Sequence, residues 1–131
     1  MRKELQDTLV KDFPALYGQI GLPPSQTCMC WGFECGSGWF DIIYNLSQKI
    51  TELDPECQAV QVKEKFGGLR FYINGTRSDM VYPLISNAED ESYNTCESCG
   101  TKENVSQNEY GWIHTLCDTC RTKIRAGGKM E

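Results

Sequence analysis

The sequence contains a single histidine, His114, and no run of about 18 apolar residues. One imidazole leaves no pair of histidines to share proton transfer, and no Walker loop or nucleophile elbow is present. We therefore expect a protein that is not an enzyme. The missing apolar run excludes a membrane-spanning helix, and the charged N-terminus, MRKELQD, does not resemble a signal peptide. These features favour a cytoplasmic location.

An excess of positive charge is also missing from this chain. Its 131 residues include 13 Lys and Arg against 18 Asp and Glu, a formal net charge of −5. General nucleic-acid binders are usually basic, so we do not expect nucleic acid as the partner. A local excess of positive charge does occur between residues 63 and 77, a segment that contains Lys63, Lys65, Arg70 and Arg77 but only one acidic residue, Glu64. Such a patch can attract a small anion, although a solvated hairpin face is the plainer interpretation.

Hydrophobic periodicity predicts three helices and one hairpin. Apolar residues at helical spacing predict helices over residues 4–17, 39–53 and 78–92, and Pro14 can end the first of them early. Alternating residues on either side of a Gly67–Gly68 turn predict a β-hairpin over residues 58–74.

The predicted fold class is α+β, with a small helix–helix–β-hairpin–helix body over residues 1–95. A zinc ribbon over residues 96–125 is expected to pack on this body. Residues 126–131 are expected to form a frayed tail.

Two CxxC pairs give the strongest signal in the sequence. Cys96 and Cys99 form the first pair, and Cys117 and Cys120 follow after seventeen residues. Two residues between thiols let both sulfurs face one ion, and tetrahedral zinc takes two such pairs. Gly100 can supply the left-handed turn that commonly follows a pair. Because four cysteines close the coordination shell, the sequence predicts one structural Zn²⁺ ion.

The remaining four cysteines leave two interpretations open. Cys28, Cys30, Cys35 and Cys57 could form a second metal site, but the CxC-x4-C spacing is poor for this purpose and Cys57 is remote. Buried thiols are therefore the favoured interpretation.

A glycine-rich turn before the second helix suggests a ligand site. Uncovered backbone N–H groups at a helix start can bind an anion, although a tight helix cap is the plainer interpretation. Aromatic rings nearby could stack on a base, and basic side chains could neutralise phosphates. The predicted ligand-binding residues are Gly36, Ser37, Gly38, Trp39, Lys63, Lys65, Arg70 and Tyr72.

Three segments of the chain resemble a family of small, largely uncharacterised proteins from tailed phages and prophages. They are ECGSGWFDII at 34–43, VKEKFGGLRFY at 62–72, and CESCG with GWIHTLCDTC within 96–120. The resemblance implies a setting in which a small accessory protein acts in the host cytoplasm against host defence. Such proteins block a host protein or sequester a nucleotide signal, and pockets in similar proteins often form between the subunits of a homo-oligomer.

Two hypotheses follow from the residues and this setting. The first is a non-enzymatic binding protein that sequesters a phosphorylated, nucleotide-type signal, either a cyclic nucleotide or an ADP-ribose derivative. The alternative is a zinc-ribbon adaptor that binds a host protein, with Tyr110, Trp112 and Ile113 as its anchors.

Overall fold

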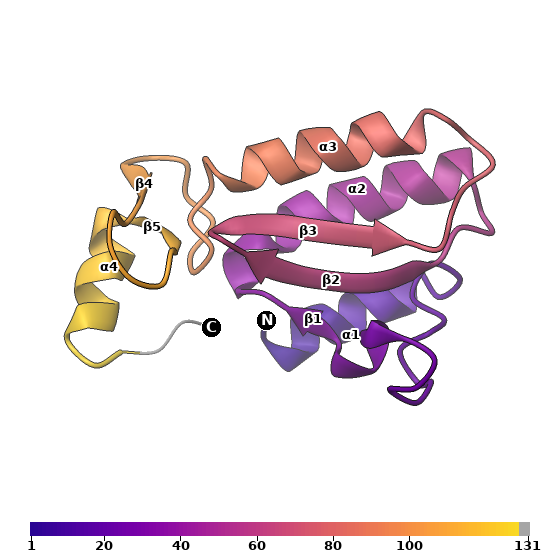
Figure 1. Ribbon diagram of the computed structural model, residues 1–131, viewed down its shortest axis with the longest axis horizontal. Helices are drawn as coiled ribbons and strands as arrows, with labels where there is room; N and C mark the ends of the chain where they lie inside the picture. The colour runs from indigo at the N-terminus through magenta and orange to yellow at the C-terminus, as the bar shows by residue number, and fades with distance from the viewer. Residues whose placement is uncertain (129–131) are drawn as a thin grey trace.

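Residues 1–128 are described by a computed structural model, in which helices cover one face of a small β-sheet (Figure 1). The fold class is α+β, as predicted. In chain order the elements are α1 (Lys3–Asp12), the 3-10 helix η1 (Cys28–Trp31), β1 (Phe33–Glu34), the 3-10 helix η2 (Ser37–Trp39), α2 (Phe40–Leu53), β2 (Ala59–Lys65), β3 (Gly68–Ile73), α3 (Val81–Ser92), β4 (Val105–Gln107), β5 (Thr115–Cys117) and α4 (Asp118–Arg125).

The apolar stripe of α2 supplies much of the core. Its buried residues are Ile42, Ile43, Leu46, Ser47 and Ile50, which recur at helical spacing as the sequence predicts. The other two helices are shorter than predicted. α1 ends at Asp12, shortly before Pro14, and α3 begins at Val81 and carries Pro83 in its first turn, where a missing N–H costs least.

The sheet has the strand order β1-β2-β3. β2 and β3 form the predicted antiparallel hairpin, whereas β1 pairs with β2 in parallel and was not predicted. Val62 lies opposite Phe71, and both are buried against the helices. Because successive side chains of a strand alternate between faces, the neighbouring cross-strand pair, Lys63 and Arg70, lies on the other face of the sheet.

The hairpin turn lies one residue earlier than predicted. Its two central residues are Phe66 and Gly67, with φ angles of +55° and +84°, and Gly68 already belongs to β3. A Cβ atom on Gly68 would lie 2.3 Å from Cζ of Tyr93. Gly68 is therefore required for the packing of the Tyr93 ring and not for the turn.

The outer edge of β3 is bonded to α3. The N–H of Leu69 donates to Oγ of Ser92 at 2.9 Å, and the N–H of Phe71 donates to Oε2 of Glu89 at 3.0 Å. These two bonds hold α3 alongside β3, as Figure 1 shows.

Residues 96–125, called the C-terminal module below, lie beyond the turn that joins β2 to β3 (Figure 1). The module consists of the antiparallel pair β4–β5 followed by α4. Residues 126–128 continue with backbone bonds to α4, including that from Gly128 N–H to the Lys123 carbonyl at 2.9 Å. The remainder of the predicted frayed tail, residues 129–131, lies outside the described residues. No helix within residues 1–128 has the length and apolar composition needed to cross a bilayer.

Asp54 fixes the chain after α2, and this role predicts a pH effect. Its carboxylate accepts hydrogen bonds from the N–H of Arg77, the hydroxyl of Thr76 and the N–H of Glu56. These bonds, with that from Arg77 first, lower the pKa of Asp54 below its ordinary value of 3.8. Because the folded pKa is the lower one, the stabilisation is present above pH 3.8 and is lost as the pH falls through the folded pKa.

The expected result is that Asp54→Asn makes the stability of the protein less dependent on pH below 4. Urea unfolding followed by circular dichroism between pH 7 and pH 2.5 measures it. Glu52→Gln, an exposed substitution on α2, is the control. Equal acid sensitivity of Asp54→Asn and the unmodified protein would contradict this role.

Candidate metal centre and binding surface

The four cysteines of the two CxxC pairs converge in the C-terminal module. All four Sγ atoms lie within 4.8 Å of one another, and those of Cys99 and Cys117 are 3.8 Å apart. Cys96 and Cys99 come from the turn after α3, Cys117 ends β5, and Cys120 lies in the first turn of α4. The arrangement is a four-cysteine site that is compatible with a metal ion.

The electrostatics of this cluster also favour a cation. Burial opposes ionisation of Cys96, but the N–H groups of Cys99, Cys117 and Ser98 outweigh it and lower its pKa to about 7. Burial and the neighbouring sulfurs instead raise the pKa of Cys120 to about 12. Four thiolates cannot all be charged at such short distances unless a positive ion lies between them.

The first CxxC pair is bonded to the glycine-rich turn that precedes α2. Gly100 adopts a φ of +83°, as expected, and its N–H donates to the Cys96 carbonyl at 2.9 Å. The N–H of Gly38 donates to the Glu97 carbonyl at 2.7 Å, and that of Gly36 donates to Oε2 of Glu97 at 2.8 Å. Burial raises the pKa of Glu97 to about 7, an effect that the Gly36 N–H partly offsets.

This contact corrects the prediction of an open anion-binding turn. The N–H groups of Gly36 and Gly38 already donate to Glu97, and Oγ of Ser37 accepts from the Arg2 N–H at 2.9 Å. Trp39 is also unavailable to a ligand, because its side chain is 0% exposed and its Nε1 donates to the Thr95 carbonyl. The turn joins the C-terminal module to the body, and Trp39 belongs to the core.

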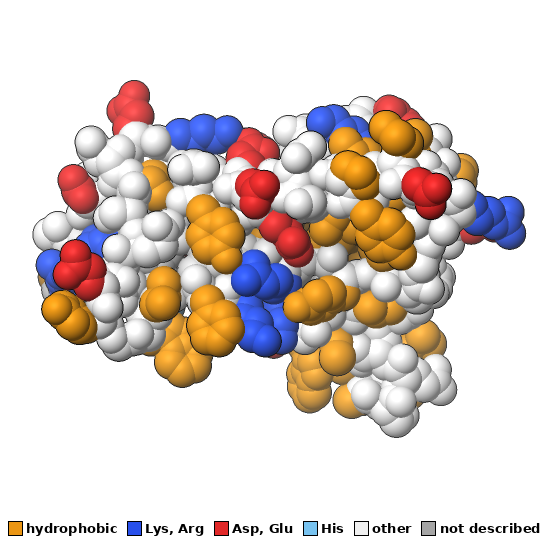
Figure 2. Space-filling view, turned by 45° about the horizontal axis from the view of Figure 1, so that its top comes forward, with side chains coloured by type: hydrophobic (Ala, Val, Ile, Leu, Met, Phe, Trp, Pro, Cys, Tyr) orange, Lys and Arg blue, Asp and Glu red, His pale blue; other side chains and the backbone are white. Residues whose placement is uncertain are grey.

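The other four predicted ligand residues do lie together on the uncovered face of the sheet. Lys63 pairs across the hairpin with Arg70. On the same face, Lys65 lies two residues nearer to the hairpin turn, and Tyr72 lies two residues further from it. None of Lys63, Lys65 and Arg70, called the basic cluster below, forms an ion pair with any residue of the described range 1–128. Figure 2 shows Lys and Arg side chains gathered near the middle of one face, with hydrophobic side chains on both sides.

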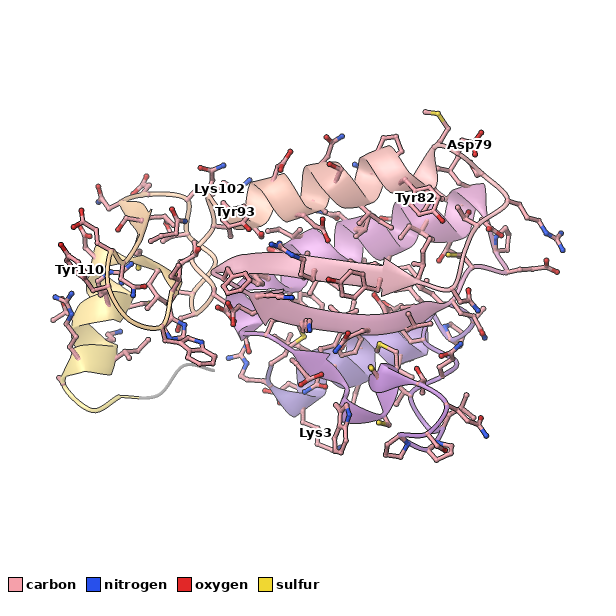
Figure 3. All side chains as sticks on the ribbon, in the orientation of Figure 1. Lys3, Asp79, Tyr82, Tyr93, Lys102 and Tyr110 are labelled. Carbon is pink, nitrogen blue, oxygen red and sulfur yellow. The ribbon has the colours of Figure 1, made fainter. Side chains whose placement is uncertain are left out.

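Tyr93 orients the arginine of the basic cluster. Nη2 of Arg70 donates to the Tyr93 hydroxyl at 3.2 Å, and Nη1 donates to the Leu69 carbonyl at 3.0 Å. Figure 3 shows Tyr93 where α3 ends, close to the C-terminal module. The hydrogen bond that Arg70 donates to Tyr93 raises the pKa of Arg70 above its ordinary value, so the guanidinium stays charged.

A groove between the hairpin turn and the C-terminal module was not predicted as a site. It has a volume of about 410 Å³. Its lining residues are Glu64, Lys65, Phe66, Gly111, Trp112 and Ile113. The sequence analysis named Trp112 and Ile113 only as anchors for a protein partner. It did not name Phe66 as a site residue, although an aromatic residue directly before two glycines in a hairpin could have indicated one.

The groove has a defined shape because hydrogen bonds fix both of its sides. Asn108 holds the module loop: its Nδ2 donates to the carbonyls of Tyr110 and Trp112 at 2.8 and 2.7 Å, and its Oδ1 accepts from the His114 N–H. The hydroxyl of Thr115, on β5, donates to the Gly67 carbonyl and ties the hairpin turn to the module. Tyr110 lies on the outer side of this loop (Figure 3).

The remaining cysteines do not form a second cluster. Within residues 1–128, the only group of three or more potential metal ligands is the four-cysteine site. Cys35 and Cys57 are buried, as the favoured interpretation required, and burial raises their pKa values to about 12 and about 11. Cys28 is exposed and Cys30 is half-buried, so burial does not describe these two.

Comparison with known proteins gave no relatives. No family model matches the chain, and no curated protein or solved structure matches it either.

Proposed function

We propose that this protein binds a phosphorylated, nucleotide-type ligand without transforming it, and that one structural zinc ion holds the C-terminal module in place. The single observation that carries the binding proposal is the basic cluster on the uncovered face of the sheet. In a chain of net charge −5, three cations lie side by side and none of them forms an ion pair within residues 1–128, although Glu34 lies opposite Lys63 on β1 and Glu89 contributes to raising the pKa of Arg70.

The basic cluster has a cost in stability, because Glu34, which lies opposite Lys63 on β1, forms no ion pair with it. Like charges directly opposite each other in an antiparallel pair destabilise it by about 0.2–1 kcal/mol, and Lys63 and Arg70 are such a pair. An anionic ligand would remove this repulsion and gain charge-assisted hydrogen bonds from both side chains. The arrangement therefore suits a bound phosphate better than an empty surface.

The zinc proposal rests on the spacing of the sulfurs. Four sulfurs at a Zn–S distance of ~2.3 Å in a tetrahedron lie about 3.8 Å apart. The distance between Sγ of Cys99 and Sγ of Cys117 is 3.8 Å. Because the four cysteines would occupy every coordination position, the ion would stabilise the module and leave no position for a substrate.

The resemblance to small phage proteins supplies the setting for this proposal. In that setting the ligand would be a nucleotide signal of host antiviral defence, either a cyclic nucleotide or an ADP-ribose derivative. Binding such a signal tightly would lower its free concentration, and no chemical step on the ligand is needed for that effect.

The proposal predicts that basic-cluster variants lose affinity but keep their fold. Lys63→Ala and Arg70→Ala should each weaken binding of ADP-ribose about tenfold or more, because each removes a charge-assisted contact. Calorimetric titration measures the affinities, and circular dichroism checks the fold.

Lys11→Ala, which removes an exposed cation from α1, is the matched control and should bind as the unmodified protein does. The proposal fails if the unmodified protein binds neither ADP-ribose nor cyclic AMP at millimolar concentration. It also fails if Lys11→Ala weakens binding as much as Arg70→Ala.

A second candidate function, an adaptor for a host protein, is favoured by the exposure of the module loop. Tyr110 and Trp112 are 87% and 78% exposed, which is unusual for rings of this size. Exposed aromatic residues on a loop with a fixed backbone are typical anchors of protein interfaces. Stoichiometric recovery of one host protein, lost in Tyr110→Ala and retained in Arg70→Ala, would favour this candidate over nucleotide binding.

A further inference from the structure

Phe66 has a backbone conformation that its own side chain disfavours. It is the first central residue of the two-residue hairpin turn, and its φ of +55° is in the left-handed region. Asn, Asp or Gly normally occupies such a position, since a larger side chain there is strained. Strain that the surrounding fold does not need is a recognised mark of functional sites.

The ring of Phe66 contributes little to the packing of the body. It is 67% exposed, and its described ring contact is with the ammonium of Lys65, 5.5 Å from the ring centroid. Neither Phe66 nor Trp112 forms an aromatic pair with another ring within residues 1–128. The groove therefore has two large aromatic side chains in its lining whose faces are not used by other rings.

The groove and the basic cluster lie in one line. Lys65 borders the groove, and Lys63 lies two residues before it on β2, further from the turn, with Arg70 opposite it. A strand advances about 3.3 Å per residue, so Lys63 lies about 7 Å beyond Lys65. Glu64 is the acid among the lining residues, and its Oε2 is already occupied by the Gly67 N–H at 2.7 Å.

From this alignment we infer that the ligand is an extended nucleoside diphosphate, whose base lies in the groove against Phe66 and Trp112 and whose two phosphates lie over Lys65, Lys63 and Arg70. The inference rests on the proposed function and narrows it. The volume of about 410 Å³ is within the range of small-molecule sites, and stacking on aromatic rings is the usual way to hold a base.

A cyclic mononucleotide fits the alignment of the groove with the basic cluster less well. Its single phosphate is closed back onto its own ribose, so with the base in the groove its charge would lie near Lys65. Lys63 and Arg70 would then keep their mutual repulsion. An extended 5′-diphosphate carries its second phosphate onward to that pair, where it would neutralise both side chains.

The test uses Phe66→Asn, since asparagine suits the left-handed position and removes the ring. Titrations compare ADP, cyclic AMP and inorganic pyrophosphate on the full chain. The unmodified protein should bind ADP at least tenfold more tightly than pyrophosphate, because stacking of one base is worth about that factor or more. It should also bind ADP more tightly than cyclic AMP, because only ADP brings a phosphate to Lys63 and Arg70. In Phe66→Asn, the affinity for ADP should fall about tenfold towards that for pyrophosphate, since Trp112 still lines the groove, and the affinity for pyrophosphate should not change.

Tyr82→Ala, which removes an exposed ring on α3 away from the groove, is the matched control and should leave ADP binding unchanged (Figure 3). The inference is overturned if ADP and pyrophosphate bind the unmodified protein equally, if cyclic AMP binds more tightly than ADP, or if Phe66→Asn retains full ADP affinity. In each of these cases a phosphate site would remain. Absence of binding by ADP, cyclic AMP and pyrophosphate alike would instead overturn the proposed function, and this inference with it.

Discussion

Gly38→Ala should destabilise the protein by about 3 kcal/mol, the upper part of the range for overpacking a tight contact. A Cβ atom at this position would lie 2.1 Å from the Cys96 carbonyl oxygen and 2.6 Å from the Gly100 nitrogen. Both atoms belong to the backbone of residues 96–100, the first CxxC pair and the glycine that follows it, so no side-chain rotation can relieve the overlap. The body and the C-terminal module would have to separate at this contact.

Urea unfolding monitored by circular dichroism measures the loss for Gly38→Ala. Gly21→Ala is the matched control, because a Cβ atom at Gly21 would meet nothing within 4 Å. The same contact holds the Cys96–Cys99 pair, so Gly38→Ala should also weaken metal binding. Equal unfolding midpoints for the two variants would show that the turn does not support the module.

Removal of the metal should unfold the C-terminal module and leave the body folded. The module's own apolar cluster consists of Cys96, Leu116, Cys117 and Cys120, so three of its four buried members are metal-ligand candidates. The buried core cluster of the body, by contrast, contains no residue beyond Ala88. A structural zinc ion contributes on the order of 10 kcal/mol to domains of this kind, far more than such a small cluster can supply.

Hydrogen exchange measured by mass spectrometry, before and after chelation, tests this expectation. Amide protection should be lost across residues 96–125 and kept in α2, β2 and β3. Cys117→Ser should reproduce the effect, whereas Cys28→Ser, which changes an exposed cysteine outside the cluster, should not. Elemental analysis should find one zinc ion per chain. Unchanged protection in the module after complete removal of the metal would contradict a structural role.

The elements that the sequence predicted well are those with a strong local signal. The apolar stripe of α2 repeats at helical spacing, and two CxxC pairs can close on one ion only by coming together. β1 has only two residues and therefore no hydrophobic periodicity, so the local sequence does not predict its parallel pairing with β2.

The prediction for the Gly36–Gly38 turn failed for a physical reason. A turn that binds an anion and a turn that donates to an oxygen elsewhere in the chain both need N–H groups that side chains do not cover. The local sequence around Gly36 and Gly38 is therefore the same in either role. Their acceptor, Glu97, is about sixty residues away in the chain, and only the fold brings it near. The hairpin turn was misplaced because two glycines are a stronger turn signal than Phe66–Gly67, whereas Gly68 serves the packing of Tyr93.

The bonds along the outer edge of β3 limit how copies of this protein can associate. An exposed edge strand offers unpaired N–H and carbonyl groups, to which a strand from another molecule can add. On β3, the N–H groups of Leu69 and Phe71 already donate to the side chains of Ser92 and Glu89. A homo-oligomer, if the ligand site requires one, would therefore not form by extending the sheet at the β3 edge.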